Sequence, residues 1–368
     1  MRDLIPDLRR WQEAGKREIA VATILETRGS SLRPAGTRMA LTAQGDVAGS
    51  VSSGCVDGDV IAEMEAVLGG AADVRFPAYG ISDQQAWGVG LSCGGEMDVM
   101  VERWTEVYDL FTDEIEAGRT VGLASRIDTP SPQHRQLGEG PAHLLITSGG
   151  VTLGSLGHPD LDREVLLEIS AAWPGPYVRR QSYPWGEVLI EVVPPPPVLL
   201  IFGATDIGMA LSRIAQVCGF EVIVSDPRRT FAREERFPGA TLHLGWPHEL
   251  EGRLLSGSQA LGSNWAIIVL FHDPKIDLPA LTLALRSEAF YIGLLGSRKT
   301  QADRRASLIE AGVELRDLSR IHGPAGLDIT SRDLPEGKSP GLIALSMMAE
   351  VIAVRHKRDL QPIDEMGR

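Results

Sequence analysis

The stretch VLLIFGATDIG, residues 198–208, decides the fold of the second half of this chain. Its five leading apolar residues predict a strand that is buried on both faces, and a glycine-containing turn then leads into a helix. This order is typical of a doubly wound parallel sheet. The turn also matches the dinucleotide-binding fingerprint in part, with Gly203 and Gly208 at its first and last glycine positions.

The same alternation of strands and helices continues downstream. Apolar runs predict strands at 221–226, 265–271 and 290–295, and a helical stretch at about 339–355 closes the series. We therefore predict a Rossmann-like domain over residues 198–358, followed by a tail at 359–368.

Four consecutive prolines at 194–197 predict a stiff linker before this domain. Residues 1–193 contain an internal repeat with one constant offset and no gap. The matched residues are Thr42, Gly45, Gly49, Ser50, Asp57, Val60 and Glu63 in one copy, and Thr147, Gly150, Gly154, Ser155, Asp162, Val165 and Glu168 in the other. We predict an N-terminal α+β domain built from two related units, at about 18–103 and 118–193.

Composition limits the classes of protein that the chain can belong to. A net charge of −13 argues against a nucleic-acid partner, which needs a basic face. No window has the roughly 18 uninterrupted apolar residues of a membrane span, and the N-terminus has no signal-peptide core. Three cysteines in 368 residues do not form a disulfide framework, so we expect a cytoplasmic location.

Two of the three cysteines lie in glycine-flanked loops of the first repeat copy. Cys55 follows Gly54, Cys93 precedes two glycines, and a thiol in such a loop is usually accessible. Cys218 lies in an apolar run, so we expect it to be a buried structural residue. The second copy has His158-Pro159-Asp160 and Tyr183-Pro184-Trp185 in place of the two cysteine loops.

The glycine- and serine-rich turn at 49–58 leads into a predicted helix and would present free N–H groups to an anion. The same setting would favour the thiolate form of Cys55. Arg28, Arg33 and Arg38 lie upstream, and arginine suits phosphates and carboxylates. These features predict a site for a phosphorylated small molecule; the alternative is a surface loop beside a helix N-cap.

The cysteines do not suit the common metal centres. No C-x-x-C pair occurs, and no histidine follows Cys55 or Cys93 at zinc-ligand spacing. An iron–sulfur cluster needs about four thiolates. A Cys–His hydrolase would need a base from a distant histidine such as His272 or His322.

The Rossmann turn departs from the fingerprint at its second glycine, where Thr205 stands. A side chain there obstructs the approach of a pyrophosphate. Asp226 ends the second predicted strand and could bind a ribose hydroxyl, with Arg228 close behind it. NAD(P) binding is therefore left open.

Two later loops fall at the carboxyl ends of predicted strands. His272 and Asp273 form either a proton-transfer pair or a strand-end cap. Ser297 and Arg298 follow a glycine and suit an anion. The loop 322–328 has no assigned chemistry.

With these motifs the chain resembles the XdhC/CoxI family, accessory proteins of molybdenum hydroxylases such as xanthine dehydrogenase. The resemblance covers about residues 10–355. In the first half it rests on 26–36, 49–58 and 93–95, and in the second half on 202–204, 226–228, 272–275, 291–298 and 323–328. The family usually reads Gly-Ala-Gly-His in the Rossmann turn, where this chain has Thr205 and Asp206.

The resemblance implies a chaperone that binds the molybdenum cofactor (Mo-molybdopterin), protects its sulfurated form and inserts it into its target. The implied partners are an apo molybdenum hydroxylase of the xanthine dehydrogenase type and a cysteine desulfurase. Cys55 and Cys93 are candidate contacts to the cofactor's molybdenum. Some relatives carry the dehydrogenase's own name, but three cysteines cannot ligate the two clusters of that enzyme.

Two other functions remain as alternatives to this non-catalytic maturation factor. One is an NAD(P)-dependent oxidoreductase that uses the Rossmann-like domain, with His272 and Asp273 as weak catalytic candidates. The other is a redox sensor that uses Cys55 and Cys93 as a switch. A homodimer is compatible with the sequence, which carries no direct sign of one.

Overall fold

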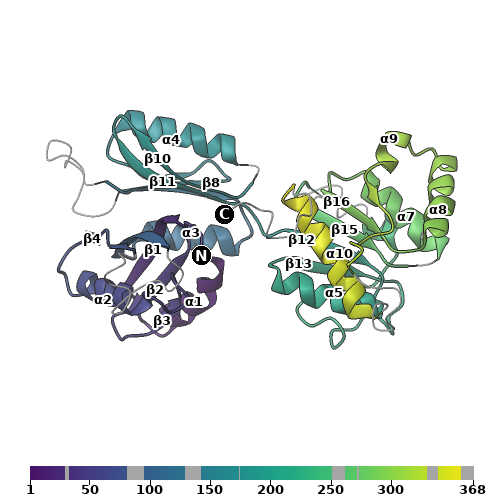
Figure 1. Ribbon diagram of the computed structural model, residues 1–368, viewed down its shortest axis with the longest axis horizontal. Helices are drawn as coiled ribbons and strands as arrows, with labels where there is room; N and C mark the ends of the chain where they lie inside the picture. Colours follow the sequence, from purple (N-terminus) through teal and green to yellow (C-terminus); the bar gives the residue numbers. More distant parts are fainter. Residues whose placement is uncertain are drawn as a thin grey trace. The chain divides into compact units, whose positions relative to one another are not determined.

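The computed structural model describes residues 1–29, 33–80, 95–128, 142–173, 175–250, 262–271, 273–329 and 339–357 (Figure 1). Contacts within the chain divide it into two compact units, Met1–Pro195 and Pro196–Arg368. Over the described ranges, every helix is too short or too polar to cross a membrane.

Unit 1, Met1–Pro195, contains two antiparallel sheets with matching strand orders. The first has the order β3-β2-β1-β6-β4, with β5 also paired to β6, and the second has the order β10-β11-β7-β8-β9. The strands of the first sheet are β1 (Ile19–Arg28), β2 (Arg38–Thr42), β3 (Val47–Gly49), β4 (Val74–Arg75), β5 (Ala78–Tyr79) and β6 (Glu96–Arg103). Those of the second are β7 (Val121–Arg126), β8 (His143–Thr147), β9 (Thr152–Gly154), β10 (Tyr177–Tyr183) and β11 (Gly186–Val193). The order β3-β2-β1-β6 recurs as β9-β8-β7-β11, which confirms the duplication.

Helices cover both outer faces of this pair of sheets (Figure 1). The helices of unit 1 are η1 (Arg2–Leu4), α1 (Ile5–Glu13), α2 (Asp57–Leu68), α3 (Glu106–Glu116) and α4 (Pro159–Ala172). Apolar residues of α2 pack on the first sheet, and those of α4 pack on the second. Tyr108 and Phe111 of α3 pack with Val21 of the first sheet and Leu123 of the second, so the two copies share one inner core.

Among the described residues, two buried side-chain pairs, an Arg–Glu ion pair and a His–Glu hydrogen bond, cross this inner core between the copies. Arg38 on β2 donates from Nη1 to Glu191 Oε1 on β11 at 2.9 Å, and the two side chains are 1 % and 3 % exposed. Its counterpart in the second copy, His143 on β8, lies 2.9 Å from Glu102 on β6. Each pair therefore joins one copy to the other.

Two equivalent glycines end the second strands, β3 and β9, of the β2–β3 and β8–β9 hairpins. Gly49 and Gly154 have φ of +76° and +84°. A Cβ atom would lie 2.6 Å from the carbonyl oxygen of Arg38 at the first, and 2.2 Å from that of His143 at the second. Only glycine fits either position.

Unit 2, Pro196–Arg368, is built on one sheet in which every adjacent pair is parallel. Its order is β14-β13-β12-β15-β16-β17. The strands are β12 (Val198–Phe202), β13 (Glu221–Ser225), β14 (Thr241–His243), β15 (Trp265–Val269), β16 (Tyr291–Leu294) and β17 (Ile321–His322). The helices are α5 (Asp206–Val217), η3 (Pro247–Leu250), α7 (Pro274–Leu285), α8 (Arg298–Glu310), α9 (Leu315–Leu318) and α10 (Pro340–Arg355).

Helices lie on both faces of this sheet, as the sequence predicts for a doubly wound fold. Apolar residues of α5 and α10 form one core with one face, and those of α7 and α8 form another core with the opposite face. The strand order reverses between β12 and β15. Ligands of such folds bind at the carboxyl ends of the strands beside this reversal.

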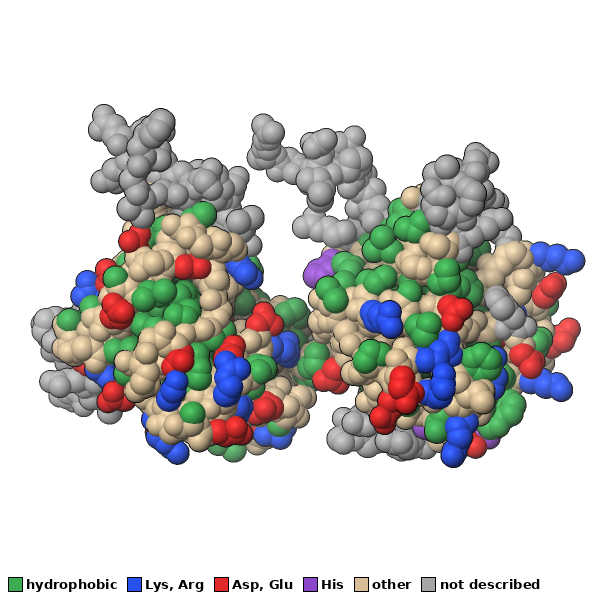
Figure 2. Space-filling model, turned by 90° about the horizontal axis from the view of Figure 1, so that it is seen from below, with side chains coloured by type: hydrophobic (Ala, Val, Ile, Leu, Met, Phe, Trp, Pro, Cys, Tyr) green, Lys and Arg blue, Asp and Glu red, His purple; other side chains and the backbone are tan. Residues whose placement is uncertain are grey.

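Charged side chains of both signs are interspersed over the face of each unit drawn in Figure 2. A nucleic acid requires a continuous basic surface. The described residues on this face do not form one.

Candidate functional site

Cys55 lies in the loop between β3 and α2, and its side chain is half-buried. It packs against the core cluster that contains Val51, Val56 and Met97. The beginning of β6 and the Cys55 loop therefore share one hydrophobic cluster.

The Asp57 carboxylate holds this loop in place. It accepts hydrogen bonds from both hydroxyls, Ser50 Oγ at 2.6 Å and Ser52 Oγ at 2.7 Å. It also accepts from the backbone N–H groups of Val51 (3.2 Å), Ser52 (2.9 Å) and Gly54 (3.0 Å). Burial opposes ionisation of Asp57, but these hydrogen bonds outweigh it and hold the pKa of the carboxyl below its usual range.

The loop thus surrounds an anion of its own. The expectation that the turn at 49–58 offers its N–H groups to an external anion does not fit this geometry, because three of those groups, that of Gly54 included, bind Asp57. The second copy repeats the device with fewer donors: Asp162 accepts from Ser155 Oγ at 2.6 Å and from Leu156 N at 2.7 Å. What the loop does present is the Cys55 side chain on a fixed backbone.

Larger side chains fill the corresponding place in the second copy. His158 aligns with Ser53, and its ring stacks on Trp185 with centroids 5.2 Å apart. Arg126 donates to the carbonyls of Leu156 (2.9 Å) and Trp185 (2.8 Å). In the first copy, no described atom lies within 4 Å of where a Cβ on Gly54 would be. The described part of the Cys55 loop is therefore the more open of the two.

The three predicted arginines do not gather around Cys55. Arg28 is half-exposed and pairs with Glu26, Glu96 and Asp98 at 2.8, 3.1 and 2.9 Å. These carboxylates raise its pKa above its ordinary value. The Arg28 guanidinium is thus already surrounded by negative charge.

Arg38 is buried and faces Glu191, with the rings of Tyr108 and Phe111 within 6 Å of its guanidinium carbon. The expectation that it contacts an anionic ligand does not fit this position. Arg33 is exposed. Arg28 and Arg38 are thus paired with carboxylates of the protein itself and do not belong to the candidate site around Cys55.

Cys93 and Cys218 are the other two cysteines of the chain. Cys93 lies outside the described residues. Cys218 caps the C-terminus of α5 and is exposed, so the expectation of a buried structural cysteine is wrong. The apolar run before Cys218 belongs to α5, and the last residue of this helix, Val217, is exposed to solvent. Among the described residues, no group of three or more His, Cys, Asp or Glu side chains could hold a metal ion.

The Rossmann turn keeps two of the three fingerprint glycines in their structural roles. Gly203 has a φ of +122°, and a Cβ on Gly208 would lie 2.6 Å from the Gly203 carbonyl oxygen. Thr205 stands at the second glycine position as the N-cap of α5, and its hydroxyl accepts from Gly208 N at 3.1 Å. Asp206 pairs with Arg236 at 3.0 Å.

Asp226 is fully buried at the end of β13, and both of its carboxylate oxygens are engaged. Oδ2 accepts from Ala204 N at 2.8 Å, and Arg228 donates to both oxygens. This engagement raises the pKa of the Arg228 guanidinium above its ordinary value. Gly203, Asp226 and Arg228 are thus brought together, but the carboxylate that would bind a ribose hydroxyl already binds the protein.

The later loops are partly described. Asp273 is the N-cap of α7 and accepts from Lys275 N at 3.0 Å, as in the strand-end-cap alternative. His272 lies outside the described residues. Ser297 caps α8, accepting from Thr300 N at 3.2 Å, and Arg298 begins that helix, its side chain lying outside the described part.

A polar network that the sequence does not predict ties the loop after β17 to α10. Glu350 accepts from Tyr291 Oη at 2.7 Å and from Gly326 N at 2.6 Å, and lies 3.0 Å from His322 Nδ1. Burial opposes ionisation of Glu350, but these hydrogen bonds hold its pKa below the usual range. Burial and the Glu350 charge raise the pKa of Tyr291. This network holds the loop 322–328, which has no assigned chemistry from the sequence, at His322 and Gly326.

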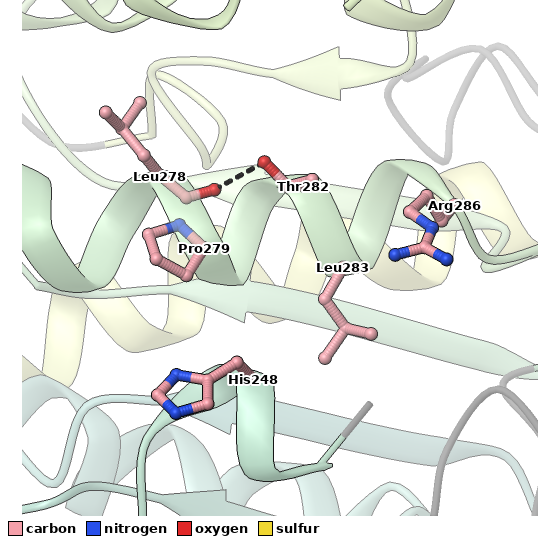
Figure 3. A pocket seen from close by; sticks show the side chains of 6 residues that line it. All are labelled: His248, Leu278, Pro279, Thr282, Leu283 and Arg286. Atoms are coloured by element: carbon pink, nitrogen blue, oxygen red, sulfur yellow. Dashed lines mark hydrogen bonds between the residues drawn. The ribbon is translucent and has the colours of Figure 1, made fainter. Parts of the chain in front are cut away.

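A pocket of about 320 Å³ lies between η3 and α7. Figure 3 shows His248 of η3 facing Pro279 and Leu283 of α7, with Arg286 at the far side. Leu278 and Thr282 complete the lining. The pocket contains none of the predicted site residues, so we do not assign it to the same site.

A solved structure has the same fold as this chain. A structure of a Bacillus halodurans protein described as a xanthine dehydrogenase superposes with a TM-score of 0.72, at 23 % identity, over 99 % of both chains. At this identity the match establishes the fold of the whole chain.

Two relatives of known sequence match nearly the full chain. One is a Bacillus subtilis protein named as a probable subunit of xanthine dehydrogenase, 27 % identical over 92 % of this chain and 94 % of the relative. The other is the molybdenum cofactor insertion chaperone PaoD of Escherichia coli, 26 % identical over 93 % of this chain and 85 % of the relative.

Family models match within both units. The model of the XdhC and CoxI family matches residues 11–77, which contain the Cys55 loop. The model of the XdhC Rossmann domain matches residues 199–351, nearly all of the described part of unit 2. The chain belongs to the XdhC and CoxI family.

Proposed function

We propose that this protein is a molybdenum-cofactor chaperone that takes part in the maturation of a molybdenum hydroxylase of the xanthine dehydrogenase type. The observation that carries the proposal is the similarity to PaoD, a molybdenum cofactor insertion chaperone, over 93 % of this chain. The Bacillus subtilis relative, whose name refers to xanthine dehydrogenase, supports the class of target. In this role the protein binds its cargo and releases it to the apoenzyme, without turning over a substrate.

The Cys55 loop is the part of the molecule that we assign to the cargo. A cysteine sulfur is a soft ligand and suits a molybdenum centre or its terminal sulfur. The five hydrogen bonds to Asp57 fix the backbone before any ligand arrives, so little conformational entropy is lost on binding. No described residue lies within 4 Å of a Cβ on Gly54, so the described part of the loop leaves room for a bulky group.

Cys93 is the second thiol of the proposed site. The support comes from the second copy, where the residues that align with the two cysteine loops include His158 and Trp185, which are in ring contact. We propose that the duplicated scaffold gives the first copy the same neighbourhood and uses it for two thiols. Protection of the sulfurated cofactor, and docking of a cysteine desulfurase that supplies its sulfur, belong to the same proposal.

The oxidoreductase alternative has less support. Thr205 occupies the fingerprint position that a pyrophosphate needs clear, and its hydroxyl caps the helix end. The Asp226 carboxylate binds Ala204 and Arg228. Both features weigh against NAD(P) held in the ordinary dinucleotide manner.

A transfer assay tests the proposed function. The protein is loaded with isolated molybdenum cofactor, freed of unbound cofactor, and mixed with an apo hydroxylase of the xanthine dehydrogenase type. We expect activity to appear at a higher yield than with the same amount of free cofactor, because bound cofactor is shielded from oxidation. Yields equal to those with free cofactor, or with an unrelated carrier protein, contradict the proposal.

Loading the protein with sulfurated and, separately, with desulfurated cofactor tests whether it protects the sulfurated form as well as inserting the cofactor. A chaperone of the sulfurated form should return active hydroxylase only after the first loading. The terminal sulfur should also survive longer on the protein than in solution, as measured by cyanide-releasable sulfur. Equal lifetimes would remove the protective role while leaving insertion intact.

A further inference from the structure

The loop after β13 places an arginine beside the reversal of strand order in unit 2. Arg228 follows the carboxyl end of β13, and Phe271 follows that of β15, on the other side of β12. The guanidinium carbon of Arg228 lies 5.2 Å from the centroid of the Phe271 ring and 4.5 Å from that of Phe231. The loop therefore reaches across β12, to the place where doubly wound sheets bind ligands.

The guanidinium of Arg228 is held in a fixed orientation. Its Nε lies 3.0 Å from Asp226 Oδ1, and its Nη2 lies 2.8 Å from Asp226 Oδ2. Asp226 is itself fully buried and is fixed by Ala204 N. Nη1 makes no hydrogen bond to any described residue, and 43 % of the side chain is exposed. One edge of a positioned guanidinium thus remains able to bind an oxyanion.

The guanidinium of Arg228 lies over an exposed aromatic ring, that of Phe231. Phe231 is 42 % exposed, and the guanidinium carbon of a second arginine, Arg236, lies 5.6 Å from its centroid. Arg236 is fixed by the carbonyl oxygens of Ala204 (3.1 Å) and Phe231 (3.0 Å) and by Asp206. Phenylalanine rings and guanidinium planes are the surfaces on which proteins stack nucleic-acid bases.

The local charge favours an anion in spite of the acidic chain. Residues 226–236 contain four arginines against three carboxylates, whereas the whole protein carries a net charge of −13. Thr205 caps the N-terminus of α5 beside this loop. The arginines are therefore better placed than the helix end to donate hydrogen bonds to a phosphate.

We propose that Arg228 and Phe231 form a nucleotide subsite, in which Arg228 binds a phosphate and the Phe231 ring stacks on the base. The ligand class is a nucleoside monophosphate unit, free or as part of a larger molecule. The arrangement differs from ordinary NAD binding because Asp226 orients Arg228 and does not read a ribose. For a cofactor chaperone, such a subsite would select the dinucleotide form of the cofactor, a consequence that rests on the proposed function.

The test is calorimetric titration of the full chain with CMP, GMP, AMP and inorganic phosphate as separate probes. We expect saturable binding of at least one nucleotide, with an affinity about tenfold or more above that of phosphate, the factor that stacking of one base supplies. Arg228→Gln should weaken this nucleotide about tenfold. Arg229→Gln, which changes the exposed neighbouring arginine, is the matched control and should not.

Phe231→Leu gives a second, independent readout if Arg228→Gln fails to fold because Asp226 is left buried without its partner. This variant removes the exposed ring and should bring the nucleotide affinity down to that of phosphate. The proposal is overturned if no nucleotide saturates below about 1 mM, if phosphate binds as tightly as the nucleotides, or if Phe231→Leu binds them unchanged. Binding of molybdenum cofactor is measured separately, so a failure here leaves the proposed function standing, and the reverse also holds.

Discussion

Asp57 is the residue on which the geometry of the Cys55 loop depends most. Asp57→Asn keeps the size of the side chain but replaces an acceptor oxygen by a donor and removes the charge. We expect the variant to lose about 1–3 kcal/mol of unfolding free energy, since a charged acceptor of several hydrogen bonds is lost at a partly exposed position. Asp162→Asn is the matched control, because Asp162 accepts from only two described groups and should cost less. Urea denaturation measures both, and a larger loss for Asp162→Asn would contradict this account.

The pH dependence of that difference has a definite sign. The pKa of Asp57 in the folded protein lies below its ordinary value of 3.8. Its stabilising contribution is therefore complete at pH values above 3.8 and is lost as the pH falls through the folded pKa. The gap in stability between the wild type and Asp57→Asn should be constant near neutral pH and shrink in acid. A gap that widens in acid would contradict the assignment of the charged form.

Single residues also mark where sequence reasoning succeeded and where it did not. The constant offset of the repeat pairs Asp57 with Asp162, and each carboxylate accepts a hydrogen bond from the serine seven residues before it. The same offset pairs Arg38 with His143, a signal that could have identified Arg38 as a core residue. Its partner Glu191 lies 153 positions away, beyond what local pattern reveals. The sequence pattern also does not reveal that the N–H groups of the Cys55 loop bind the carboxylate of Asp57.

At the scale of elements, the hairpins of unit 1 show how backbone conformation restricts sequence. Gly45 and Gly49 both have positive φ, but a Cβ on Gly45 would meet no described atom within 4 Å, whereas one on Gly49 would meet the Arg38 carbonyl. Gly45→Ala should cost about 1–2 kcal/mol, the strain of the left-handed conformation alone. Gly49→Ala should cost about 2 kcal/mol more, because a backbone carbonyl cannot move aside cheaply. Equal losses in chemical denaturation would show that the close approach is unimportant.

The ion pair between Arg38 and Glu191 joins the β2 and β11 elements of different copies. Arg38→Met should destabilise the protein by about 3–5 kcal/mol, because it leaves Glu191 buried without a counter-charge. Adding Glu191→Leu should recover much of that loss, because an apolar pair can replace a buried ion pair. A double-mutant cycle by urea denaturation measures this coupling. A double variant less stable than Arg38→Met would contradict the direct pairing.

The elements that could be predicted are those with a strong local signal. The buried strands at 198–202 and 265–269 are continuous apolar runs bounded by turns, and the last helix begins at a serine N-cap followed by Pro340. The short strands β4, β5 and β17, of two residues each, carry too little pattern to be predicted. The Tyr291–His322–Glu350 network joins two strands and a helix, so it exists only in the folded sheet.

The whole molecule combines a duplicated unit with a Rossmann-like unit, and its two copies have diverged in what they present. The first copy offers Cys55 on a rigid loop, and the second fills the aligned place with His158, Trp185 and Arg126. Arg38 and His143 are buried, and each pairs with a glutamate of the other copy, Glu191 and Glu102, so the two copies share a buried polar interface. A scaffold stabilised in this way can carry the half-buried Cys55 in a loop of one copy without losing its core.

The assignment of the cargo to unit 1 leads to a prediction that compares two cysteines. Cys55→Ala should weaken retention of molybdenum cofactor about tenfold or more, since it removes a soft ligand. Cys218→Ala, an exposed position in the other unit, should leave retention unchanged. Cofactor remaining after gel filtration measures both variants, and equal retention would remove Cys55 from the site.

Equilibrium binding of isolated molybdenum cofactor to the purified wild-type protein tests the central claim most directly. The protein is titrated under anaerobic conditions and the bound cofactor is followed by its absorbance and metal content. This account predicts saturable binding at micromolar protein, with a defined stoichiometry per chain. An absence of saturable binding in that range would contradict it.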